Sequence, residues 1–273
     1  MRIVRHLHPS PLRLSVLIGL VCLGVLGFIA KSGTTKQGDI LLQRSKLLRD
    51  LDVDHLTVQN QTSGFTVISV QKTTEGYIKI TLRNDYPKTI VAYQLSVGST
   101  TTLVDSFTNG SKPGIEPGEL RERIEPVDVD PELFRRGIIV RAVVFNDATA
   151  DGDPQFVQQI DDFRLGEMLQ TKQFLSSLSN IREAFGRETL SQLEEAKLTM
   201  LNLEEDKRFS ADVMSGLRNM RLLFSRDIDE IVNANDNDRT DVMRISVDRY
   251  QSRFNDIRDY NEKARQRQIR QER

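Results

Sequence analysis

Several residue types are scarce in this sequence of 273 residues: it has one cysteine, three histidines and no tryptophan. A single cysteine cannot form an intrachain disulfide, and it excludes zinc or iron–sulfur sites that need several cysteines. Three histidines leave little material for a metal centre, so we expect no cofactor. The formal net charge is −1, from 38 basic and 39 acidic residues. Nucleic-acid-binding proteins usually have a strongly basic face, so we do not expect nucleic acid as a partner.

Enzyme motifs are also missing. The sequence contains no G-x-S-x-G, no H-E-x-x-H and no glycine-rich phosphate loop. His55 stands far from the other two histidines, which argues against a histidine-based catalytic triad. Two acidic pairs, Asp161-Asp162 and Glu194-Glu195, fall in predicted helices, where adjacent side chains diverge. We interpret both pairs as solvated helix faces rather than as an acid/base pair, and we expect no enzymatic activity and no small-molecule substrate.

The only excess of positive charge is at the N-terminus. Residues 1–54 contain eight basic and four acidic groups, whereas residues 55–153 and 154–273 have net charges of −3 and −2. An uncharged run of seventeen residues, 14–30, would span roughly 25 Å as a helix, which is the short end of a membrane span. We predict a membrane anchor there. The anchor residues that we single out are Leu14, Leu17, Ile18, Leu20, Val21, Leu23, Val25, Leu26, Phe28 and Ile29.

Two alternatives remain for this segment and its orientation. A cleaved signal peptide would leave a secreted protein, but the small residues of Ala30-Lys31-Ser32 flank a charge. We therefore favour an uncleaved single-pass anchor. Basic residues precede and follow the run, so the positive-inside count does not settle the orientation. A short tail ahead of a first apolar run usually stays in the cytoplasm. We predict a cytoplasmic tail at 1–13, a juxtamembrane stalk at 31–54, and soluble domains outside the cytoplasm.

From about residue 56 the hydrophobic period becomes two, as in β-strands. Ile78, Ile80 and Leu82 alternate with polar residues, and Val91, Tyr93, Leu95 and Val97 do the same. The run 138–145 is almost wholly apolar, which is typical of a central strand that is covered on both faces. Further strands are predicted at 65–70, 101–107 and 120–125. Six or seven short strands separated by turn residues predict an antiparallel β-sandwich over residues 55–150.

Part of this block resembles a bacterial family of immunoglobulin-like modules, the FxLYD type. The strand that ends in Leu82-Arg83-Asn84, the turn at Pro87-Lys88 and the strand 89–97 are similar to the paired central strands of those modules. The segment Ile115-Glu116-Pro117-Gly118-Glu119 is similar to their Pro-Gly-Glu turn, whereas Tyr93-Gln94-Leu95-Ser96 stands in place of their Leu-Tyr-Asp. The resemblance covers residues 56–146. It implies an extracytoplasmic Ig-like β-sandwich and no chemistry.

An acidic segment follows the predicted sandwich. Residues 146–153 offer several oxygen donors beside Gly152, but the twelfth position counted from Asp147 is Gln158, not the glutamate that an EF-hand needs. We interpret the segment as a turn that leads into a helix, with Asp153 as N-cap and Pro154 in the first helical position. A bound cation is the alternative interpretation.

Residues 153–273 predict a helical bundle or coiled-coil-like domain, because apolar residues recur there at helical spacing. Ser210 is expected to cap the third helix, and residues 233–238 interrupt the pattern before the fourth. The seam of this last helix, our candidate partner-binding surface, consists of Met243, Val247, Tyr250, Phe254 and Ile257. It either packs within the chain or pairs with a protein partner or a second copy. The arginine-rich end beyond this seam is expected to project into solvent, with an acidic partner or anionic surface as the alternative role.

Taken together, these patterns predict an α+β multidomain protein with an N-terminal transmembrane helix, an antiparallel Ig-like β-sandwich and a C-terminal helical domain. The function that we expect is a single-pass, non-enzymatic binding or scaffolding protein of the bacterial cell envelope. One alternative is a secreted or anchored hydrolase that uses carboxylates alone, and another is a cytoplasm-facing membrane-tethered adaptor.

Overall fold

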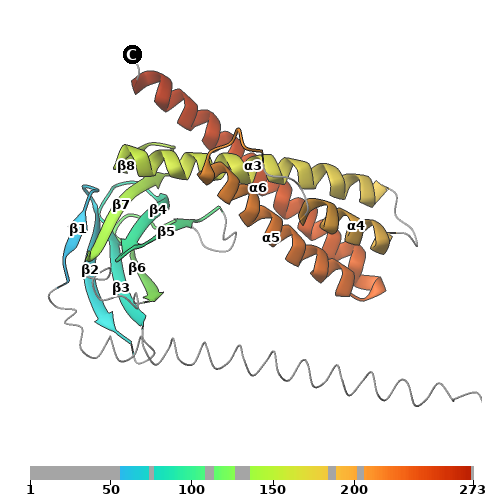
Figure 1. The fold of residues 1–273 in the computed structure, drawn as a ribbon, viewed down its shortest axis with the longest axis horizontal. Helices are drawn as coiled ribbons and strands as arrows, with labels where there is room; N and C mark the ends of the chain where they lie inside the picture. Colours follow the sequence, from blue (N-terminus) through green and yellow to red (C-terminus); the bar gives the residue numbers. More distant parts are fainter. Residues whose placement is uncertain are drawn as a thin grey trace, which may run out of the picture.

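The structure is a computed structural model that describes residues 56–73, 77–107, 114–126, 136–183, 189–201 and 206–271. The predicted tail, anchor and stalk lie outside the described residues. Within them, no helix combines the length and the apolar character that crossing a bilayer requires. The described chain is an α+β protein in which two β-sheets precede four helices, in agreement with the coarse prediction (Figure 1).

Eight strands form two sheets in the described residues. The smaller sheet has the order β2-β3-β6 and contains β2 (Phe65–Lys72), β3 (Tyr77–Asn84) and β6 (Leu120–Pro126). The larger sheet has the order β1-β7-β4-β5, with β8 also paired to β7. It contains β1 (Val58–Asn60), β4 (Ile90–Val97), β5 (Thr100–Asp105), β7 (Ile138–Phe145) and β8 (Ala150–Gly152).

The two sheets share one apolar core. Phe65, Ile80 and Leu82 of the smaller sheet pack with Leu95 and Val140 of the larger one, and all five are at most 1% exposed. The predicted antiparallel arrangement is wrong at one edge, because β1 runs parallel to β7. Neither β1 nor β8 was expected, since three-residue strands are too short to show a period of two.

The polar positions of strand β4 are buried. Gln94 and Ser96 are 4% and 2% exposed, because helix α3 (Pro154–Glu183) covers that face of the larger sheet. A register shift between Ile90 and Ala92 also turns Ile90, rather than Val91, toward the core between the sheets. β7 behaves as predicted, with one face in the core between the sheets and the other beneath α3.

The helices follow without a linker, since α3 begins two residues after β8 ends. The Asp153 carboxylate accepts a hydrogen bond from the Gln155 amide at 2.9 Å, and Pro154 takes the first helical position, as predicted. Helix α4 comprises Thr189–Leu201 and α5 comprises Ala211–Asn233. The Ser210 hydroxyl accepts the Val213 amide at 3.2 Å, so the predicted cap of α5 is confirmed. Only two residues separate α5 from α6 (Asp236–Gln271).

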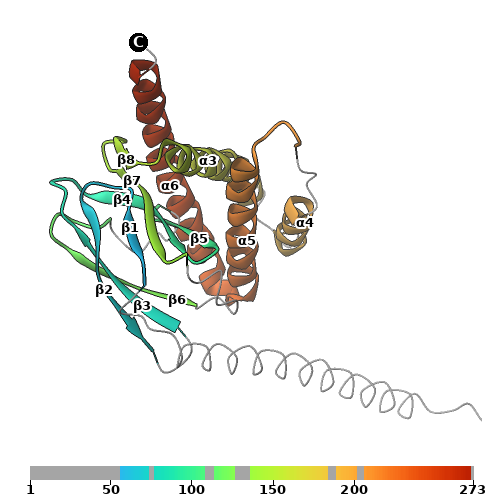
Figure 2. The same ribbon diagram turned by 60° about the vertical axis from the view of Figure 1, so that its left-hand side comes forward.

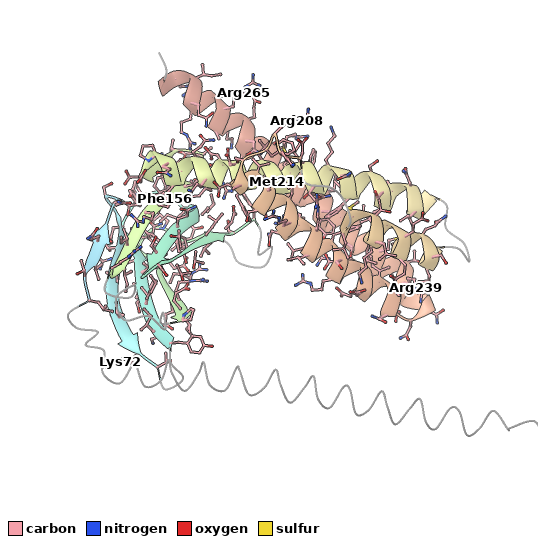
Figure 3. The ribbon with its side chains drawn as sticks, in the orientation of Figure 1. Lys72, Phe156, Arg208, Met214, Arg239 and Arg265 are labelled. Atoms are coloured by element: carbon pink, nitrogen blue, oxygen red, sulfur yellow. The ribbon has the colours of Figure 1, made fainter. Side chains whose placement is uncertain are left out.

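The helices form a bundle that extends from one side of the sandwich. Helix α3 lies across the larger sheet, and α5 and α6 pack along it, while α4 is the helix farthest from the sandwich (Figures 1 and 2). Stacked Phe174 and Phe224, with ring centroids 3.8 Å apart, form the centre of the bundle together with Tyr250. In Figure 3, Phe156 marks the end of α3 on the sandwich and Met214 marks the start of α5.

Candidate functional site

A buried ion pair joins the sandwich to the bundle. Arg164 of α3 donates from Nε to Asp105 Oδ2 at 2.6 Å and from Nη2 to Asp105 Oδ1 at 3.1 Å. Their side chains are 0% and 1% exposed. The guanidinium carbon lies 4.0 Å from the ring centroid of Tyr260 and 4.4 Å from that of Phe107, so the cation is held between two aromatic faces. We call these four residues the joint.

The electrostatics of the joint are those of a fixed ion pair. Burial by itself lowers the pKa of Arg164, but the Asp105 carboxylate outweighs this effect, and the pKa is raised from its usual value. The charge on Arg164 is therefore permanent in the folded protein. Asp105 stands at the end of β5, and its Oδ1 also accepts the Phe107 amide at 2.8 Å, which fixes the chain at that point.

A second contact fastens α6 to both α3 and the sandwich. The Tyr260 hydroxyl donates to Asp161 Oδ1 at 2.6 Å, and Arg267 donates to the other oxygen of the same carboxylate. Arg267 also donates from Nη1 to the Ala148 carbonyl in the turn between β7 and β8, at 2.6 Å. Burial raises the pKa of Asp161, although Tyr260 and Arg267 oppose the shift. The prediction that Asp161 belongs to a solvated face is therefore wrong, whereas Glu194 and Glu195 are exposed as expected.

The polar line of α3 continues past the joint into the bundle. Glu167 is fully buried and accepts from Asn219 of α5 at 3.0 Å and from Arg253 of α6 at 2.9 Å. One turn further, Gln170 accepts from Arg221 at 2.9 Å, and the Thr171 hydroxyl donates to the Glu167 carbonyl. These contacts specify which face of α3 meets α5 and α6, because an unpaired buried charge would be costly.

A groove of about 610 Å³ lies beside the second contact, between α3 and α6. Leu165, Met168 and Ala264 supply its apolar part. Its other lining residues are polar or charged: Gln158, Asp161, Asp162, Arg258, Asp259, Asn261, Glu262, Arg265 and Gln268. Opposite charges are interspersed around the groove, and Asp259 is already paired with Arg258 at 2.9 Å.

The predicted partner-binding seam is placed inside the chain. Met243, Val247, Tyr250 and Ile257 are buried, the first three in the core of the bundle, and Phe254 is half-buried. The Tyr250 hydroxyl donates to Asp227 of α5 at 2.6 Å. The structure thus favours packing within the chain over pairing with another protein. The predicted anchor residues, 14–29, lie outside the described residues.

The expectation that the end of α6 projects into solvent is also wrong as far as Arg267. Tyr260 and Ala264 are 3% and 4% exposed, because they pack on α3 and on the outer face of the larger sheet. Arg267 is bonded to the sandwich rather than to solvent. Beyond Ile257, helix α6 contacts the rest of the protein through tyrosine, alanine and arginine instead of large apolar residues. The hydrophobic pattern of the sequence therefore does not show that the contact continues.

The acidic segment after β7 does not gather its carboxylates. Asp147 pairs with Lys88 at 2.7 Å, Asp151 accepts the Ser63 amide at 2.7 Å and the Tyr86 hydroxyl, and Asp153 caps α3. The three side chains therefore serve three different parts of the fold. Among the described residues, no group of histidine, cysteine, aspartate or glutamate has the arrangement of a metal site.

Sequence reasoning missed the joint. Its signal was visible in α3, where Asp161, Arg164 and Glu167 recur at three-residue spacing beside the apolar residues that run from Ile160 to Phe174. Charged residues on a buried helical face require partners, and that requirement marks a contact. The identity of the partners is not readable, because Asp105 lies 59 positions from Arg164.

The comparisons with known proteins place no constraint on this site: no protein-family model matches the chain, and neither a curated protein nor a solved structure does.

Proposed function

We propose that this chain is a single-pass, membrane-anchored, non-enzymatic scaffolding or binding protein of the bacterial envelope, with its sandwich and bundle outside the cytoplasm. The observation that carries the proposal is the joint. Arg164 and Asp105 fix one domain against the other. Together with the contact from Arg267 to Ala148, they make the sandwich and the bundle one rigid arm. A rigid arm on an anchor displays binding surfaces at a fixed distance and angle.

The sheet connections support an Ig-like assignment of the sandwich. The chain passes between sheets from β3 to β4, from β5 to β6 and from β6 to β7, which is the Greek-key pattern of such sandwiches. The parallel β1 also lies at an edge of the larger sheet. Modules of this kind commonly serve as spacers and binding units outside the cytoplasm, in line with the predicted anchor.

The chemistry of the groove supports a role without catalysis. A hydrolase that relied on carboxylates would need two of them facing one substrate bond. In the groove, Asp161 is bonded to Tyr260 and Arg267, and Asp162 accepts from Gln158 and Ser210. Both acids hold helices together in this arrangement.

A topology reporter tests the location. An enzyme that is active only outside the cytoplasm, fused after Arg273, is expected to be active, and the same enzyme fused ahead of Met1 is expected to be inactive. Activity of a cytoplasm-only reporter after Arg273 would contradict the proposal and favour the cytoplasm-facing adaptor.

Distance measurements between spin labels test the rigid arm. Labels at Gln71 on β2 and Leu198 on α4, both exposed, are expected to give one narrow distance distribution in the full-length protein. Arg164→Leu is expected to broaden it, whereas Arg244→Leu, which removes an exposed arginine of α6, leaves it unchanged. A broad distribution in the unmodified chain would overturn the role as a rigid scaffold.

A further inference from the structure

Strand β6 has one open edge. It pairs with β3 on one side and with no strand on the other within the described residues. The Asn84 amide donates to the Glu119 carbonyl at 3.1 Å just ahead of β6. Antiparallel ladders alternate, so the backbone groups of the odd-numbered residues of β6 face β3 and those of the even-numbered residues face the open edge. The edge therefore offers the N–H and C=O groups of Leu120, Glu122 and Ile124.

The side chains on the outer face of β6 are unusually apolar for positions that are exposed to solvent. Leu120 is 56% exposed and Ile124 is 63% exposed, and only the exposed Glu122 lies between them on that face. Most edge strands that stay unpaired are short or carry charges on such positions. β6 has seven residues, which is long enough to serve as a template for another strand.

The inward-facing side chains of β6 determine which kind of strand can pair with its open edge. Arg121, Arg123 and Glu125 alternate along the inner face, in the order positive, positive, negative. Arg123 donates to Glu125 at 2.9 Å, and Arg121 donates to Glu119 at 2.8 Å. Inward charges protect an edge against strands that cannot pair with them. A strand that presents the reverse order of charge pairs with them instead.

We propose that two copies of this chain associate by antiparallel pairing of their β6 strands, about a two-fold axis that passes beside Arg123. In this register Arg121 of each copy lies opposite Glu125 of the other. Glu122 lies opposite Ile124 of the second copy, and their edge-facing backbone groups exchange hydrogen bonds. The two smaller sheets become one continuous sheet, and the exposed edge disappears from both copies.

Of the two neighbouring registers, the charges disfavour the one centred on Glu122. The one centred on Ile124 leaves Leu120 and Arg121 of each copy beyond the end of the other copy's β6. Centring the pair on Glu122 keeps the backbone alternation but places Arg121 opposite Arg123 twice, and Glu122 opposite itself. Like charges directly opposite each other destabilise a strand pair, and opposite charges stabilise it by about 0.2–1 kcal/mol per pair. The register centred on Arg123 has two favourable pairs and one like pair, at Arg123 itself, where each arginine already has its own Glu125.

Site-directed crosslinking of the full-length protein in membranes tests the proposal. In a Cys22→Ser background, Arg123→Cys is expected to form a disulfide-linked dimer on oxidation, because residues at the axis face each other. Thr66→Cys, on the opposite edge of the same sheet, is the matched control and is expected to stay monomeric. Equal crosslinking at both positions, or none at residue 123, would overturn the proposal.

A proline scan separates pairing from folding. Glu122→Pro removes an amide that faces the open edge and leaves the ladder to β3 intact, so it is expected to abolish crosslinking through Arg123→Cys. Glu122→Ala also loses the contact to Lys79 but keeps the amide, and it is expected to crosslink as before. Crosslinking that survives Glu122→Pro would exclude β6 pairing.

A mixed experiment covers the case in which Arg123→Cys perturbs the strand by removing the partner of Glu125. Glu122→Cys and Ile124→Cys are both exposed, and mixing the two single variants is expected to yield a mixed disulfide dimer. If the mixture yields no more dimer than Ile124→Cys alone, the register is wrong and the proposal fails.

Discussion

Gly166 of α3 and Gly216 of α5 lie directly against each other's helix. A Cβ placed on Gly166 would fall 2.0 Å from the Val213 carbonyl oxygen, and one placed on Gly216 would fall 2.0 Å from the Phe163 carbonyl oxygen. Backbone meets backbone at this crossing, so only hydrogen fits at either position. The two helices cross next to Glu167, so their close approach sets the distance that separates the polar side chains of α3 from those of α5.

Gly166→Ala and Gly216→Ala are expected to lower the free energy of unfolding by about 3 kcal/mol each, at the upper end of overpacking costs, because the helices must separate. Ser215→Ala, one residue away on the exposed face of α5, is the matched control and is expected to change it little. Denaturant unfolding followed by circular dichroism measures this. Equal stability of Gly216→Ala and Ser215→Ala would contradict the close approach of α3 and α5 at these glycines.

Arg164→Leu is expected to lower the free energy of unfolding by about 3–5 kcal/mol, because it leaves the buried Asp105 carboxylate without its cation. The double variant Arg164→Leu/Asp105→Leu is expected to recover a large part of that loss, since no uncompensated charge remains. Urea unfolding of the parent protein, Arg164→Leu, Asp105→Leu and the double variant gives the coupling free energy between the two side chains. Additive losses would show that the two side chains act independently.

The stability of the sandwich is expected to fall in acid partly through Asp147. Burial acts to raise the pKa of this carboxyl, but hydrogen bonds from Lys88 and Thr149 outweigh it and lower the pKa from 3.8 to about 2. The unfolded chain binds the proton more tightly, so the contribution of Asp147 is complete above about pH 4 and is lost as the pH falls toward 2. Asp147→Asn is expected to flatten the pH dependence in that window. The exposed Asp256→Asn variant should retain the slope of the parent protein.

Tyr260→Phe is expected to lower the free energy of unfolding by about 1–2 kcal/mol, because the buried Asp161 carboxylate loses one of its donors. Phenylalanine preserves the ring beside Arg164, so the cation–π contact remains. Thermal unfolding compared with Tyr77→Phe, a half-buried tyrosine of β3, measures the effect of the hydroxyl. A loss of the same size in both variants would argue against the contact between Tyr260 and Asp161.

Much of the fold follows from local patterns. Period-two alternation locates β3, the apolar run locates β7 within its observed bounds, and Asp153 and Ser210 mark the starts of α3 and α5. These features depend on neighbours in the sequence.

The joint and the glycine crossing depend on partners that are distant in sequence. The stripe of α3 shows that charges interrupt it, but only the packed chain shows that Asp105 neutralises Arg164. Gly166 and Gly216 are equally uninformative alone, because a glycine within a helix does not indicate which helix approaches it. The bulge in β4 also escapes prediction, since a single extra residue reverses the faces of the positions that precede it.

The parallel pairing of β1 with β7 has a mechanical consequence. Tension that arrives from the N-terminal side of Val58 pulls β1 along its own axis, while the bundle holds β7 from its C-terminal end through β8 and α3. Because the two strands run in the same direction, this load shears their ladder. The hydrogen bonds from Ile138 to Thr57 and from Gln61 to Val140 then bear the force together and do not open one after another. The sandwich is thus fastened to the chain that precedes it in a geometry that resists pulling along the strand.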